Sequence, residues 1–264
     1  MKIRFFTIIL LVLAAIPVYA GSISCSTATS LVPDGRLLDF DSVQANTGNW
    51  YQFTAIAGRS YSVEVRDDLD PDNSDLTVTY YTTGSCPLPN SYTSFTDTHT
   101  YEPVVPASTK RVSIVTSSAG GGTYWIKVQN GSTTTSHYVS VGVTETTIYS
   151  PAWTTQGSPA YTTQWILLNT TSQSITYTIT LTATFNGSQT YSYANATLGP
   201  LTNKILNTSD TSTFSPVVNL NQGGYSIVIH NGPPGAVQPY EVEYNFGFSS
   251  PSLIPIPIGP MRGK

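Results

Sequence analysis

The chain has 264 residues, only 10% of them charged, and its formal net charge at pH 7 is −4. It has no basic patch, so nucleic acid is not an expected partner. The length suffices for two ordinary domains.

The first twenty residues have the pattern of a secretory signal peptide. A basic start at Met1–Arg4 precedes an apolar run from Phe5 to Val18. Val18 and Ala20 are small residues at the two positions before Gly21 that a signal peptidase recognises. The run is short for a bilayer span, so we expect cleavage after Ala20 rather than a retained membrane anchor. Loss of Lys2 and Arg4 takes the 11 basic side chains to 9 against 15 acidic ones, so the charge falls from −4 to −6.

No later segment has the length of a transmembrane helix, and we therefore expect a secreted, extracellular protein, with a periplasmic or cell-surface location as the alternatives. The two cysteines, Cys25 and Cys86, then predict one structural disulfide. It would close a loop of about 60 residues and contribute about 4 kcal/mol in the chain-entropy model. Two free thiols are the alternative, since a redox pair would need closer spacing.

Period-two alternation of apolar and polar residues dominates the chain after Ala20. In the segment 175–185, every second residue from Ile175 to Phe185 is apolar and lies on one face, and the intervening threonines lie on the other. The segment is followed by the hairpin signal Asn186-Gly187. Other alternating segments are 61–65, 76–80, 124–128, 139–143, 225–229 and 242–246. The pattern predicts an all-β protein of two consecutive antiparallel β-sandwich domains.

The expected order is a signal peptide at 1–20, a first sandwich at 21–147, a second at 150–250 and a proline-rich tail at 251–264. The tail's prolines have no N–H donor, so the tail cannot form a central strand. We expect it to be extended, and either disordered or laid along a neighbour.

The first domain resembles the bacterial pre-peptidase C-terminal domain, a small β-sandwich of exported proteins. The resemblance is carried by Trp50-Tyr51-Gln52-Phe53-Thr54-Ala55, Ala57-Gly58-Arg59-Ser60-Tyr61-Ser62-Val63, the acidic stretch before Leu76, Gly122-Thr123-Tyr124-Trp125-Ile126-Lys127-Val128 and the strand Tyr138–Val141. It covers roughly Gly35 to Val143. We expect no attached protease domain, which departs from the usual setting of that family.

The second domain looks like an uncharacterised secreted bacterial β-domain. The resembling residues are Pro151-Ala152-Trp153, Leu168-Asn169-Thr170-Thr171, the long strand to Phe185 and His230-Asn231-Gly232-Pro233-Pro234-Gly235-Ala236. This resemblance implies a fold and an exported location, and no activity.

An acidic cluster is the sharpest chemical feature of the sequence. Five carboxylates fall within nine residues, at Asp67, Asp68, Asp70, Asp72 and Asp75. Hard oxygen ligands at such spacing suit Ca²⁺, and some domains of the resembled family bind calcium in this region. The spacing is not that of an EF-hand, so a solvated acidic turn is the alternative. No other cofactor is expected.

No catalytic motif is present. The three histidines, His99, His137 and His230, lie far apart in the sequence, and His230 precedes a turn that its side chain is expected to cap. Glu241 and Glu243 share one strand face, which we expect to be wet. We therefore expect a protein that is not an enzyme.

Aromatic residues favour a binding function, since flat rings stack on sugar faces. Trp50 and Trp125 stand in alternating strands, where a core position is expected. Trp153 has a weaker strand context and is the candidate for an exposed, ligand-binding aromatic.

These observations favour a non-enzymatic exported accessory or binding module at the cell exterior that recognises polysaccharide or a surface protein. A structural subunit of an extracellular assembly or filament is one alternative, and an unrecognised hydrolase is another. The ligand and the oligomeric state are left open.

Overall fold

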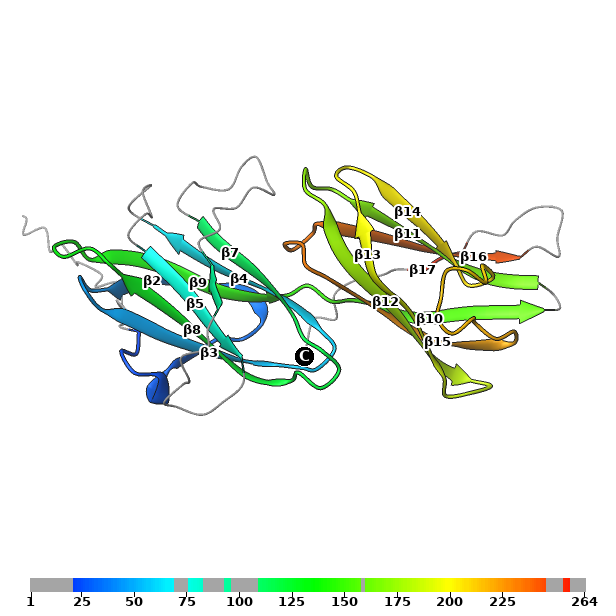
Figure 1. Ribbon diagram of the computed structural model, residues 1–264, viewed down its shortest axis with the longest axis horizontal. Coiled ribbons are helices and arrows are strands. Elements are labelled where there is room, and N and C mark those ends of the chain that lie inside the picture. The colour runs from blue at the N-terminus through cyan, green and yellow to red at the C-terminus, as the bar shows by residue number, and fades with distance from the viewer. Residues whose placement is uncertain are drawn as a thin grey trace, which may run out of the picture.

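The structure, a computed structural model, describes residues 21–68, 76–82, 93–95, 109–157, 160–245 and 254–256. In these residues the protein is all-β, apart from one 3-10 turn, η1 (Cys25–Thr27). Two sandwiches follow each other along the long axis of the molecule (Figure 1). The expected fold class is confirmed. The expected signal peptide lies outside the described residues, and within them no helix is long and apolar enough to cross a bilayer.

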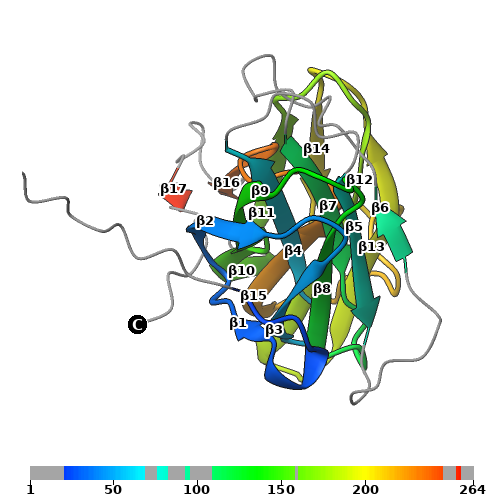
Figure 2. The same ribbon diagram turned by 90° about the vertical axis from the view of Figure 1, so that its left-hand side faces the viewer.

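Two stacked sheets form the N-terminal sandwich. The five-stranded sheet has the order β1 (Thr29–Ser30), β3 (Gly48–Ala55), β8 (Gly122–Asn130), β5 (Leu76–Thr82) and β6 (Thr93–Phe95). The four-stranded sheet has the order β2 (Asp34–Val43), β9 (His137–Glu145), β4 (Ser60–Asp67) and β7 (Thr109–Val115). Inward-facing residues of both sheets, among them Tyr51, Phe53 and Val63, form one core. Among the strands that the structure describes, β1 alone pairs in parallel, and it lies beside β3 at the edge of the five-stranded sheet (Figure 2).

One curled sheet forms both layers of the C-terminal sandwich. Its order is β13 (Thr190–Leu198), β12 (Ile175–Phe185), β15 (Gln222–His230), β10 (Ile148–Gly157), β11 (Ala160–Asn169), β16 (Val237–Asn245) and β17 (Ile254–Ile256), and β14 (Asn203–Asn207) also pairs with β11. β10 and β11 pair only at their hairpin end, through Thr155–Gly157. The sheet folds over at this hairpin, so that Trp165 of β11 joins one core with Leu181 of β12.

The long strand β12 has the expected inward face. Ile175, Tyr177, Ile179, Leu181 and Ala183 are buried, and the intervening threonines are not. Phe185 departs from this pattern and is 66% exposed, because the register with β15 shifts between Ala183 and Phe185.

The chain passes between the sandwiches at Thr146 and Thr147, after β9 ends at Glu145 and before β10 begins at Ile148. Among the described strands none of the first group pairs with one of the second. The two core clusters are likewise separate. The domain limits given above stay a prediction, and they place the boundary in this same segment.

The proline-rich tail provides a short edge strand. β17 pairs antiparallel with β16, and Pro255 stands opposite Val242. An edge position suits a residue without an N–H donor. The neighbour along which this part of the tail lies is therefore its own sheet.

We predict that residues 148–264 fold without the N-terminal sandwich, because one complete core cluster lies within them. The isolated fragment should unfold in one cooperative transition followed by circular dichroism. Leu181→Ala should lower its free energy of unfolding by about 2–5 kcal/mol, whereas Thr184→Ala, at an exposed position of the same strand, should have little effect. A fragment without a cooperative transition would show that the C-terminal sandwich needs the N-terminal one in order to fold.

Candidate functional site

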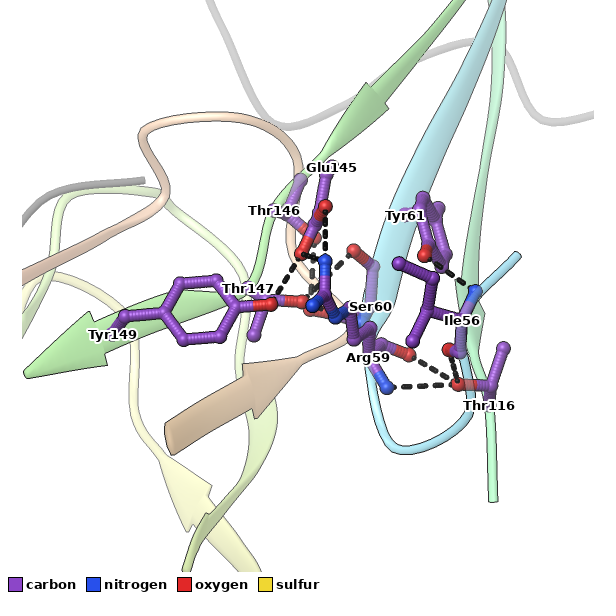
Figure 3. Close-up of polar contacts among 9 residues, drawn as sticks. All are labelled: Ile56, Arg59, Ser60, Tyr61, Thr116, Glu145, Thr146, Thr147 and Tyr149. Carbon is purple, nitrogen blue, oxygen red and sulfur yellow. Dashed lines mark hydrogen bonds and ion pairs between the residues drawn. The ribbon is translucent and has the colours of Figure 1, made fainter. Parts of the chain in front are cut away.

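Buried polar groups join the two sandwiches at the crossover (Figure 3). The backbone N–H of Ser60 donates to the Thr147 hydroxyl at 2.9 Å, and the Thr146 hydroxyl donates to Ser60 Oγ at 3.0 Å. The backbone N–H of His230, at the end of β15, also donates to Ser60 Oγ, at 3.4 Å. Ser60 is fully buried at the start of β4. One hydroxyl thus connects a strand of each sandwich with the crossover.

An ion pair between Arg59 and Glu145 lies at the same junction (Figure 3). Arg59 Nη1 lies 3.2 and 3.1 Å from the two carboxylate oxygens of Glu145, and the Tyr149 hydroxyl donates to Glu145 Oε1 at 2.6 Å. The guanidinium also lies 5.3 Å from the centre of the Tyr149 ring. Burial and the Glu145 carboxylate both raise the pKa of Tyr149, which stays a neutral donor. These groups satisfy one another, and we assign the cluster to holding the sandwiches together.

The two described histidines have structural positions. His230 Nδ1 accepts the backbone N–H of Gly232 at 3.1 Å, so it caps its turn as expected. Burial lowers the pKa of His230 to about 4, and the ring is neutral at pH 7. His137 Nδ1 contacts the Asp67 carboxylate in the interior of the N-terminal sandwich. His99 lies outside the described residues.

The proposed calcium ligands are described only in part. Asp67 is buried and contacts His137, while Asp68 Oδ2 accepts the Ser140 hydroxyl at 2.6 Å. Asp70, Asp72 and Asp75 lie outside the described residues. The part of the chain that the structure describes holds no group of three or more metal-ligating side chains. Calcium binding stays a prediction, although Asp67 points into the sandwich rather than outward from the loop.

The predicted disulfide is also described only in part. Cys25 begins η1, and Cys86 lies outside the described residues. Their pairing stays a prediction.

The expectation that Trp153 is exposed is wrong. Trp153 is 2% exposed, and its indole N–H lies 3.3 Å from the carbonyl oxygen of Thr182 and 3.0 Å from that of Tyr225. The cause is a bulge in β10, where Ser150 pairs with Ser226 but Trp153 pairs with Gly224. The extra residue reverses the alternation, and the ring turns inward.

Trp50 and Trp125 project from the outer face of the five-stranded sheet. Tyr51 and Phe53 take the inward positions of β3, so Trp50 and Gln52 project outward. Trp125 stands opposite Gln52 and Tyr81, and Lys127 stands opposite Trp50. The core expectation is therefore wrong for Trp50, which is half-buried, whereas Trp125 is buried as expected, at 6% exposed, although it projects from the outer face.

These side chains form a cluster that we call the aromatic face, comprising Trp50, Tyr81, Trp125 and Lys127. The rings of Trp50 and Tyr81 have centroids 5.4 Å apart, and Lys127 Nζ lies 5.6 Å from the centre of the Trp50 ring. Trp50 and Tyr81 are half-buried, so part of each ring is open to solvent. Three hydrogen-bonded strands hold the cluster in place.

Glu241 is a buried carboxyl group in the C-terminal sandwich, contrary to the expected wet face. It is 1% exposed and stands opposite Trp165, so both side chains point inward. Burial raises the pKa of Glu241 to about 7. The nearby Ser150 hydroxyl and Trp165 indole N–H lower this pKa, but they offset only part of the effect of burial. Within the described residues, neither carboxyl oxygen has a hydrogen bond of good geometry. Glu243, two residues along, is partly exposed.

We predict that Glu241 makes the protein less stable as the pH rises. Its pKa is raised in the folded state, so folding favours the protonated form, and stability is lost between about pH 4.5 and 7. Relative to Glu241→Gln, the wild type should lose about 1–3 kcal/mol across this range, measured by urea unfolding. Using the difference removes the opposite contribution of His230, whose lowered pKa favours folding as the pH rises.

Glu243→Gln is the matched control and should leave the pH dependence unchanged. If the free energy of unfolding changes with pH equally in the wild type and in Glu241→Gln, burial does not raise the pKa of the Glu241 carboxyl.

Comparison with protein-family models finds no match to the chain, and comparison with curated proteins finds none either. The resemblances described above therefore stay predictions.

Proposed function

We propose that the protein is a non-enzymatic exported accessory or binding module at the cell exterior that recognises polysaccharide through the aromatic face. The observation that carries the proposal is the pairing of two partly open rings, Trp50 and Tyr81, on the outer side of a sheet. Aromatic rings combine a large apolar surface with low conformational entropy, and they stack on the apolar faces of sugars.

Polar groups beside the rings complement this chemistry. Gln52 stands next to Trp50 on the outer side of β3, and Gln129 is exposed on β8 near Lys127. The Lys127 ammonium lies within hydrogen-bond distance of Gln129 Oε1, at 3.0 Å. Amide and ammonium groups donate to sugar hydroxyls, so the face offers stacking and hydrogen bonding side by side.

We predict that Trp50→Ala and Tyr81→Ala each weaken polysaccharide binding by about 10-fold, the value of one stacked ring. Binding is measured by depletion onto insoluble cellulose and chitin and by affinity electrophoresis in soluble glucans. Tyr225→Ala removes a 40% exposed ring from the other sandwich and should bind as the wild type does. Retention by no glycan, or equal retention of all variants, would contradict the proposal.

A structural subunit of an extracellular assembly is the second candidate, favoured by an apolar row on the C-terminal sandwich. Ile166 of β11 stands opposite Ile205 of β14 and Tyr240 of β16. Ile205 is 53% and Tyr240 57% exposed. Exposed apolar groups gathered on a sheet face are typical of interaction surfaces.

We predict for this second candidate that the protein self-associates and that Ile205→Lys abolishes it, because a charge would be buried in the contact. Molar mass is measured by light scattering between about 10 µM and 1 mM. Thr184→Lys introduces the same charge at an exposed position of β12 and is the control. A monomer at every concentration would exclude self-assembly through this row.

A further inference from the structure

A buried carboxylate of the N-terminal sandwich contacts the backbone nitrogen of Gly21. Asp41, on β2, is fully buried, and its Oδ1 accepts the backbone N–H of Gly21 at 2.6 Å. Its other oxygen accepts the hydroxyl of Tyr51, which lies on β3 in the opposite sheet. Asp41 thus lies between the two layers, with Gly21 beside it.

This carboxylate has no counter-charge in the described part of the chain. None of the described lysine, arginine or histidine side chains forms an ion pair with it. Burial raises the pKa of Tyr51, and the Asp41 charge raises it further, so Tyr51 stays a neutral donor. A buried charge held only by neutral donors is costly, and an adjacent cation offsets that cost.

The geometry at position 21 admits only glycine. A Cβ atom there would lie 2.2 Å from Asp41 Oδ2 and 2.6 Å from Asn49 Nδ2. Asn49 is 2% exposed, and its side chain donates to the carbonyl oxygen of Ser42 at 3.0 Å, so it has little room to move. The next residue is held too, since the backbone N–H of Trp50 donates to the carbonyl oxygen of Ser22 at 2.7 Å. The nitrogen of residue 21 is therefore held against a buried negative charge.

We propose that Asp41 is the binding site for the α-ammonium group that cleavage between Ala20 and Gly21 creates. A protease of the signal-peptidase class would hydrolyse this peptide bond with one water molecule, leaving a carboxylate on Ala20 and a protonated amine on Gly21. The amine takes the place of the amide N–H and adds the missing positive charge without movement of the chain. Processing thereby stabilises the N-terminal sandwich, whereas in the uncut chain Asp41 has, among the described residues, only neutral hydrogen-bond donors and no counter-charge.

This inference rests on the export that the proposed function includes, and it is independent of polysaccharide binding. Its test uses two chains purified with defined starts, 21–264 and 20–264, each with Asp41 or with Asp41→Asn. Retaining Ala20 moves the charged amine one residue away from Asp41 and should lower the Tm of the wild type by roughly 5 °C or more. Asp41→Asn should lower the Tm of the chain that starts at Gly21, but not that of the longer chain.

Asp39→Asn is the matched control, because it removes the same charge from an exposed position on β2 and should shift both chains equally. Equal Tm values for the two wild-type chains would overturn the proposal. So would a difference that persists unchanged in Asp41→Asn.

A second measurement needs no variant of Asp41 and so does not depend on its folding. Reductive methylation with formaldehyde and cyanoborohydride modifies free amines, and the rate at each amine is followed by peptide mass spectrometry. The α-amine of the chain that starts at Gly21 should react at least about 10-fold more slowly than that of the chain that starts at Ala20, because an ion pair keeps it protonated. Equal rates would contradict a buried ion pair with Asp41.

Discussion

Directly opposite residues of antiparallel strands project to the same side of a sheet, and this constraint decides what the C-terminal sandwich buries. The apolar face of β12 sets the alternation of β15: Ser226 stands opposite Leu181, Val228 opposite Ile179 and His230 opposite Tyr177. A serine and a histidine are buried as a result, while Tyr225 is 40% exposed. The pairing of β11 with β16 has the same consequence. Trp165 points into the core, and Glu241, directly opposite it, therefore points into the core as well. The buried His230 at the junction and the raised pKa of Glu241 follow from register rather than from local sequence.

The strands could be predicted from the sequence because alternation is a local property. Each alternating segment named above lies in a strand over its described residues, which for the segment 242–246 end at Asn245. The inward faces could not always be predicted, because a bulge or a partner strand decides them. The local sequence predicts an exposed Trp153, and the bulge between Ser150 and Trp153 turns its ring inward. The aromatic face was missed for a related reason: Trp50, Tyr81 and Lys127 come from three strands whose neighbour order, β3-β8-β5, is not their order in the chain.

Charged side chains are scarce, at 10% of the sequence, and several of those in the described residues bind one another. Arg66 and Arg111 both contact Glu64 and hold its pKa below the usual value against the effect of burial. Arg59 and Glu145 are paired at the junction. Such pairs orient strands and sandwiches more than they add stability. A binding surface on this protein would therefore draw mainly on rings, hydroxyls and amides, as the rings of the aromatic face and the neighbouring amides of Gln52 and Gln129 do.

The Asp41 site and the aromatic face meet on β3. The same strand supplies Tyr51, which donates to Asp41 from its inward side, and Trp50, whose ring lies on the outward side. The segment that follows Gly21 pairs with this strand through Ser22 and β1. An ion pair at Gly21 would hold that segment in place and so keep the edge of the sheet ordered beneath the Trp50 ring. Under the proposal, cleavage before Gly21 would affect ligand binding through stability alone, since Asp41 is buried on the side of the strand away from the rings.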